Sequence, residues 1–170
     1  MGDHGIAVLV AREGLTFGTS LAEADLKSDT APVTPLVRAA LEAGGEGVRF
    51  FRDPTRGGVA TVLKELALQT GLNFWIDEAE IPMNPAVAAA CEMLGFDPLY
   101  IANEGKVLAV VAPEVAEAVL EAWRGLPLGR QAAQIGEVRP EPAGEVHCAT
   151  QIGGTRIVDM LAGEQLPRIC

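Results

Sequence analysis

The chain has 170 residues, a formal net charge of -10 and 49% hydrophobic residues, of which only a few are aromatic. A chain of this length can bury the core of one domain without disulfide bonds. The acidic charge repels nucleic acid and anionic membranes, and no apolar run is long enough to cross a membrane. We therefore expect a cytoplasmic protein whose partners are small molecules or proteins, with no nucleic acid and no membrane among them.

The first half of the chain alternates between apolar runs and helical patterns. Residues 6–10 are apolar and rich in β-branched side chains, which predicts a buried strand. Residues 32–43 repeat apolar side chains at the helical period and stop at two glycines, which predicts a helix. A short strand at residues 48–51 then leads through a turn at 53–58 into a helix over residues 59–70.

The second half predicts more strands than helices. In chain order, the predicted elements are a strand at 73–76, a helix at 86–94, strands at 99–102 and 107–111, a helix at 114–123, and strands at 132–138, 145–149 and 156–158. Antiparallel neighbours toward the end favour an α+β fold with a layered mixed sheet and helices. We expect residues 1–160 to form this domain and residues 161–170 to form a flexible tail.

Three cysteines are odd in number, widely spaced and without a CxxC pair, so they do not indicate a disulfide framework or a zinc knuckle. Cys91 lies in an alanine-rich run and is interpreted as a small buried hydrophobe. His147 and Cys148 are neighbours in a predicted strand, so they face opposite sides and no metal site is expected from them. Cys170 ends the chain, where its thiol can travel into another site and be acylated; a chance terminal cysteine is the alternative.

The densest internal motif is Asp53-Pro54-Thr55-Arg56-Gly57-Gly58, between a strand and a helix. Paired glycines let backbone N–H groups approach a partner at the positive end of the helix, and Arg56 adds a fixed cation for phosphate or carboxylate. The alternative is a well-capped helix start, with Thr55 or Asp53 as the cap and Asp53 paired with Arg56. It is not a Walker A loop, because no Gly-Lys-Ser/Thr follows.

Two further groups could move protons. Glu104, in Asn103-Glu104-Gly105-Lys106, lies between two apolar runs, and partial burial there would suit a carboxylate to proton transfer. The alternative is a solvent-exposed hairpin turn. Asp3 and His4 near the start form an acid/base or anion-contacting pair, or an ordinary chain end.

Taken together, Gly2-Asp3-His4-Gly5, residues 53–58 and the final Pro167-Arg168-Ile169-Cys170 resemble the C-terminal part of the HypE family. These are the carbamoyl dehydratases of nickel–iron hydrogenase maturation, within the aminoimidazole ribonucleotide synthetase-like superfamily. The likeness covers nearly the whole chain. The motif at 53–58 recurs across the superfamily, whereas the terminal Pro-Arg-Ile-Cys is specific to HypE.

The resemblance implies an activity divided between two domains. Members carry most of the ATP and magnesium site and the homodimer interface on an N-terminal domain, which this chain is expected to lack. It implies that Cys170 accepts a carbamoyl group from the carbamoyltransferase HypF. ATP-dependent dehydration then gives a thiocyanate, and the cyano group passes to iron on the HypC–HypD scaffold. Alone, this chain is expected to bind no cofactor and to dehydrate nothing.

The same resemblance implies roles for particular residues. Cys170 is the carrier and Glu104 is the base that removes protons from nitrogen. The residues that line the cleft and place the tail or the phosphates are Asp3, His4, Asp53, Thr55, Arg56, Gly57 and Gly58. Two other functions stay open: a non-catalytic docking module for maturation partners, and another superfamily member that acts as a sulfur carrier or phosphotransfer enzyme. The terminal Pro-Arg-Ile-Cys disfavours the latter.

Overall fold

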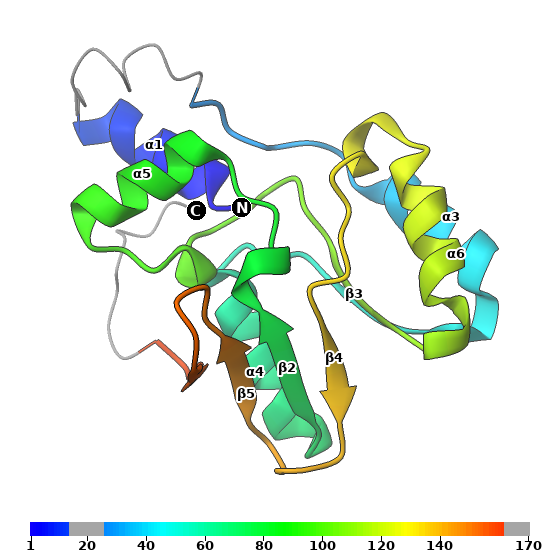
Figure 1. Ribbon diagram of the computed structural model, residues 1–170. Coiled ribbons are helices and arrows are strands. Elements are labelled where there is room, and N and C mark those ends of the chain that lie inside the picture. Colours follow the sequence, from blue (N-terminus) through cyan, green and yellow to red (C-terminus); the bar gives the residue numbers. More distant parts are fainter. Residues whose placement is uncertain (14–25, 162–170) are drawn as a thin grey trace.

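The computed structural model describes residues 1–13 and 26–161 (Figure 1). Its helices are α1 (Asp3–Glu13), α3 (Thr34–Gly44), α4 (Gly58–Thr70), α5 (Pro85–Leu94) and α6 (Pro113–Arg124). Its strands are β1 (Val48–Arg52), β2 (Asn73–Asp77), β3 (Leu108–Val111), β4 (Gly136–Arg139), β5 (Val146–Ala149) and β6 (Thr155–Ile157). The expected α+β class with mixed sheets is confirmed. No helix in the described ranges is long and apolar enough to span a membrane.

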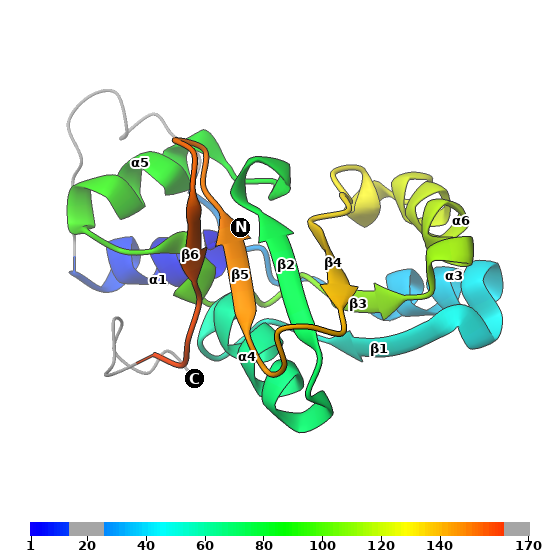
Figure 2. The same cartoon turned by 60° about the horizontal axis from the view of Figure 1, so that its bottom comes forward.

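The strands form a four-stranded sheet in the order β4-β2-β5-β6 and a separate two-stranded ribbon, β1-β3 (Figure 2). In the four-stranded sheet β2 pairs parallel to β5, while β4 and β6 run antiparallel to their neighbours. The ribbon is antiparallel, with an irregularity between Val48 and Phe50. A parallel pair and antiparallel edges make the sheet mixed, as expected, and the antiparallel neighbours near the end of the chain are β5 and β6.

Helix α4 covers one face of the four-stranded sheet, behind β2 and β5 in Figure 1. Alternation along β2 sends Phe74 and Ile76 into the core with α4. Trp75 points to the other face, where its ring stacks on His147 with the two centroids 4.5 Å apart. Cys148, next to His147 on β5, is fully buried in the core. The prediction that these two neighbours face opposite sides is therefore confirmed.

Residues 6–10 are helical, so the strand predicted there is wrong. They lie inside α1, which packs on α5. Ile6 and Leu9, three residues apart, are buried, and Ile6 joins Cys91 and Ile101 in a small second core. A short apolar run fits a buried helix as well as a buried strand, and only packing against α5 decides between them. Cys91 is a buried small hydrophobe, as expected.

Two other predicted strands differ from the structure. Residues 98–100 form a 3-10 turn, Pro98–Tyr100, because Pro98 begins it and the Asp97 side chain accepts a hydrogen bond from Leu99 N. Residues 101–106 that follow are irregular, so they are not a hairpin connection. Of residues 132–138, only Gly136 onward pairs with β2.

A second helical layer lies to one side of the sheet. Helices α3 and α6 pack against each other, and the β1-β3 ribbon joins them to the rest of the molecule (Figure 2). The indole N–H of Trp123 on α6 donates to the carbonyl of Leu36 on α3, with 2.7 Å between the two atoms. Both helices begin with a proline in the first turn, where its missing N–H costs little.

Candidate functional site

Asn103 joins three segments that are far apart in the sequence. Its side chain is fully buried, accepts a hydrogen bond from Gly2 N at 2.7 Å and donates one to Ile101 O at 2.9 Å. Its backbone N–H donates to Pro54 O at 3.1 Å. The start of α1, the loop at 53–58 and the segment before Glu104 are therefore fastened together. The hairpin-turn alternative for residues 103–106 is wrong, because this segment is built into the interior.

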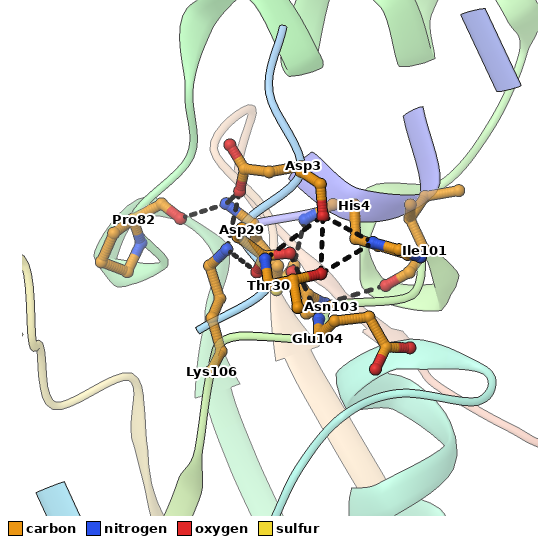
Figure 3. Close-up of polar contacts among 12 residues, drawn as sticks. Asp3, His4, Asp29, Thr30, Pro82, Ile101, Asn103, Glu104 and Lys106 are labelled. Carbon is orange, nitrogen blue, oxygen red and sulfur yellow. Dashed lines mark hydrogen bonds and ion pairs between the residues drawn. The ribbon is translucent and has the colours of Figure 1, made fainter. Parts of the chain in front are cut away.

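An ion network lies beside Glu104 (Figure 3). The Lys106 ammonium pairs with Asp3 Oδ2 at 2.7 Å and with Asp29 Oδ2. The other oxygen of Asp29 accepts the backbone N–H of Glu104 at 3.2 Å. Burial raises the pKa of Asp3, but the Lys106 ammonium and the amino terminus outweigh it and hold that pKa below its ordinary value. Asp3 is therefore a fixed anion at neutral pH rather than a proton donor.

His4 takes part in a separate set of polar contacts. Its Nδ1 lies 2.8 Å from Ser28 Oγ, which in turn lies 2.7 Å from Thr30 Oγ1. Thr30 N also donates to Ser28 Oγ at 3.2 Å. These contacts fix the segment at residues 28–30 against the first turn of α1. The segment is the one that also carries Asp29.

The loop at 53–58 brings the start of α4 against the segment that leads to Glu104. Gly58 has φ of +62°, and a Cβ there would lie 2.3 Å from Leu99 O and 2.8 Å from Ile101 O. Gly57, with φ of +68°, is the N-cap residue of α4 and no side chain caps the helix. The interpretation that Thr55 or Asp53 caps α4 is therefore wrong. Gly57 and Gly58 adopt left-handed backbone conformations, and no side chain accepts a hydrogen bond from the first N–H groups of the helix.

Asp53 and Arg56 are exposed, and no ion pair joins these two residues. The alternative in which they neutralise each other is therefore wrong. Arg56 stands two residues before the first residue of a 13-residue helix, next to backbone N–H groups that no side chain caps. The Arg56 guanidinium and the positive N-terminal end of α4 could together bind an anionic group.

Replacing Gly58 by Ala is expected to destabilise the fold by about 2–4 kcal/mol, because left-handed strain adds to a collision with the carbonyl of Leu99. Gly71 offers a matched control: its φ is +68°, yet a Cβ there would meet nothing within 4 Å. Gly71→Ala should cost about 1 kcal/mol, from backbone strain alone. Urea denaturation of both variants measures the difference, and equal losses would mean that Gly58 does not press against residues 99–101.

The two cysteines in the described residues are buried, whereas Cys170 lies outside the described residues. Burial, with a smaller contribution from Asp97, raises the pKa of Cys91 to about 11. Burial also raises the pKa of Cys148. Because the thiolate is the nucleophile, neither thiol suits acyl transfer at neutral pH.

We expect iodoacetamide at pH 8 to leave Cys91 and Cys148 unmodified in the folded chain and to label both in urea. At that pH the raised pKa of Cys91 lowers its thiolate fraction about 100-fold relative to an ordinary cysteine, and burial blocks access as well. Peptide mass spectrometry reads each site separately. Labelling of Cys91 at equal rates with and without urea would contradict its burial.

A groove of about 950 Å³ is lined by Asp3, Asp29 and Lys106 of the ion network together with mostly apolar residues of β3 and α6 and the strand β4. The charged side chain of Glu137, on β4, also lines it. Among residues 1–13 and 26–161, no group of three or more His, Cys, Asp or Glu side chains is placed to hold a metal ion.

Of the residues proposed from sequence, Asp3, His4, Glu104 and the loop at 53–58 are brought to one region through the contacts of Asn103, Asp29 and Lys106. Sequence reasoning did not single out Asp29, Ser28 or Thr30, and it noted Asn103 and Lys106 only as neighbours of Glu104. Asp29 ends a polar, irregular stretch with no pattern of its own. Gly105 marks the place where the two segments meet, since an added Cβ would lie 1.6 Å from Asp29 O, but the glycine in the sequence does not reveal which segment approaches it.

The family model for the C-terminal domain of AIR synthase related protein matches residues 1–149. Among curated proteins, the chain is 54% identical to the carbamoyl dehydratase HypE of Bradyrhizobium diazoefficiens and 55% identical to that of Rhizobium leguminosarum. Both likenesses cover 100% of this chain but only 48% and 47% of the relatives. The chain thus spans about half the length of the curated relatives it matches.

Solved structures agree with the sequence relatives. A crystal structure of the hydrogenase maturation protein HypE matches with a TM-score of 0.89 and 44% identity, over 100% of this chain and 53% of that one. HypE in complex with ATP matches at 0.88 and 43%, over 100% and 50%. The HypE–HypF complex matches at 0.86 and 42%, over 95% and 50%. The chain therefore belongs to the AIR synthase related protein family, as a C-terminal domain homologous to the second half of HypE carbamoyl dehydratases.

Proposed function

We propose that this chain is the substrate-carrying domain of a carbamoyl dehydratase in hydrogenase maturation. Cys170 accepts a carbamoyl group, and together with an N-terminal ATP-binding domain the chain converts it to a thiocyanate for delivery as a cyanide ligand to iron. The observation that supports this most strongly is identity of 54% to a HypE carbamoyl dehydratase along the entire chain. The gathering of Glu104, Asp3 and the loop at 53–58 in one region supports it independently.

The proposed chemistry forms one bond and then removes water. In the first step the Cys170 sulfur bonds to the carbamoyl carbon, and the thiol proton leaves with the departing group. ATP transfers a phosphoryl group to the amide oxygen and leaves as ADP, while nitrogen loses its first proton. The bond between carbon and this oxygen then breaks, phosphate leaves, nitrogen loses its second proton and the C≡N bond forms. Glu104 accepts one of these protons, because a half-buried carboxylate on a fixed backbone suits general-base work.

The residues of this chain fit a phosphate contact in part. The uncapped start of α4 and exposed Arg56 offer backbone N–H groups and a cation. The exposed Asp53 opposes them, and only one cation lies in this loop. We therefore assign to Arg56, Gly57 and Gly58 a share in placing the phosphates or the tail, and assign most of the ATP and magnesium site and the homodimer contact to the N-terminal domain.

The proposed partners are proteins. HypF is the proposed carbamoyl donor, which the existence of a HypE–HypF complex among matching structures supports. The HypC–HypD scaffold is the proposed acceptor of the cyano group. An acidic chain with net charge -10 is suited to protein partners and small anion-carrying groups held by Arg56, not to nucleic acid.

Intact-mass spectrometry measures both carbamoyl loading and dehydration. Incubated with HypF, carbamoyl phosphate and ATP, the chain alone should gain the mass of one carbamoyl group and show no turnover of ATP by itself. A chimaera that joins this chain to the N-terminal half of Bradyrhizobium diazoefficiens HypE should go on to lose one water. Peptide mapping should place both masses on Cys170.

The opposite outcomes separate the competing functions. Binding to HypF without any adduct on either protein favours the docking module. An unsubstituted chimaera that forms neither mass contradicts the proposed function. Detectable ATP turnover by the 170-residue chain alone contradicts the division of labour between the two domains.

A further inference from the structure

The side chain of Asp29 holds the backbone of Glu104. One carboxylate oxygen of Asp29 accepts the Glu104 N–H at 3.2 Å, and the other accepts the Lys106 ammonium. Asp29 thus bridges two positions, one on each side of Gly105. The Asp29 side chain is only 13% exposed, whereas the Lys106 side chain is 34% exposed.

The backbones of the two segments are pressed together at the same place. A Cβ on Gly105 would lie 1.6 Å from Asp29 O and 3.0 Å from Ala31 N, so only glycine permits this approach. Lys106 is tied in turn to Asp3 on α1, at 2.7 Å. Glu104 and Gly105 therefore lie against residues 29–31, while Lys106 contacts both Asp29 and Asp3.

Asn103, the residue before Glu104, fixes the chain on the other side of Glu104. Asn103 N donates to Pro54 O, and its buried amide bonds Gly2 N and Ile101 O. In Figure 3 the Glu104 carboxylate extends away from Asp29 and Lys106, on the far side of its own backbone. Asp29 consequently contacts the main chain from which the Glu104 carboxylate extends.

We propose that Asp29 is the positioning residue for Glu104: by holding the Glu104 N–H and Lys106, it fixes where the carboxylate points during dehydration. Because Glu104 is the base only in the proposed function, the role of Asp29 rests on that function. Asp29 is assigned no direct contact with the carried group in this proposal. It acts on the second step, the removal of protons from nitrogen, and not on the loading of Cys170.

The two carboxylate oxygens of Asp29 make different contacts, so two substitutions can remove one contact or both. Asp29→Asn keeps an oxygen that can accept the Glu104 N–H and loses the charge opposite Lys106, whereas Asp29→Ala loses both contacts. A displacement of about 1 Å of a catalytic group costs about 100-fold in rate. We expect Asp29→Ala to lower the single-turnover dehydration rate of the chimaera 10- to 100-fold, and Asn to restore most of it.

Carbamoyl loading by HypF distinguishes positioning from general damage, because loading precedes the step in which Glu104 acts. We expect loading of Cys170 to stay within about twofold in both Asp29 variants, a change too small to matter on the scale of a misplaced base. Glu117→Gln, which removes one exposed charge on α6, is the matched control and should change neither rate.

The inference fails on two outcomes. Dehydration at the unsubstituted rate in Asp29→Ala, while Glu104→Gln is slow, means that Asp29 does not position the base although the proposed function stands. Equal losses in loading and dehydration in Asp29→Ala, with Asn giving no rescue, mean that Asp29 is merely structural. If the unsubstituted chimaera forms no thiocyanate, the proposed function itself has failed, which is a separate result.

Discussion

Replacing Cys170 by Ala is expected to abolish the carbamoyl adduct completely, and with it every later step. The proposed carrier is a single sulfur atom, so no second nucleophile can take its place. Cys91 and Cys148 cannot substitute for it, because both are buried and burial raises both pKa values. Intact mass after incubation with HypF, carbamoyl phosphate and ATP measures the loss.

Cys170→Ser sharpens the result. A hydroxyl at the same position is a far weaker nucleophile at neutral pH than a thiol, so we expect the serine variant to behave like alanine. Cys91→Ala and Cys148→Ala serve as matched controls that should keep the adduct. An adduct of unchanged yield in Cys170→Ala would rule out Cys170 as the carrier and mean that another nucleophile of the chain accepts the carbamoyl group.

The spacing of apolar residues predicted the helices and strands that bury one face against the core. Helices α3, α4, α5 and α6 and strands β1, β2 and β5 lie close to their predicted ranges. Residues 6–10 were assigned to the wrong class because α5, which decides between helix and strand there, lies about 80 residues away in the chain. Residues 99–102 were read as apolar and extended, but Asp97 and Pro98 together favour a tight turn.

The candidate site was predicted by its motifs but not by its contacts. Glu104 and the loop at 53–58 were recognisable from a carboxylate between apolar runs and from paired glycines. Asn103 N donates to Pro54 O, and Glu104 N donates to the side chain of Asp29. Both contacts depend on segments that meet from about 50 to 75 positions apart in the chain. No local pattern encodes such a meeting, so Asp29 could be found only once the fold was known.

Replacing Glu104 by Gln is expected to leave the carbamoyl group on Cys170 and to stop the reaction there. The glutamine amide has nearly the shape of the carboxylate but cannot accept a proton from nitrogen. Loss of a general base lowers a rate by about 10²- to 10⁴-fold. Single-turnover mass spectrometry of the chimaera should therefore show normal loading followed by a thiocyanate signal that appears 10²- to 10⁴-fold more slowly. Formation of thiocyanate at the unsubstituted rate would mean that another residue is the base.

Combining this substitution with Asp29→Ala tests the connection between the two residues. If Asp29 acts only by directing Glu104, then removing it from the glutamine variant takes away nothing further, and the double variant should dehydrate no more slowly than Glu104→Gln alone. Multiplying losses would instead show that Asp29 contributes by a route of its own. Since Asp29 contacts the backbone N–H of Glu104 and not its carboxylate, that contact survives in the glutamine variant. The comparison of the two single variants and the double variant therefore separates two defects. In Asp29→Ala the base is misdirected, and in Glu104→Gln the side chain is correctly directed but cannot act as a base.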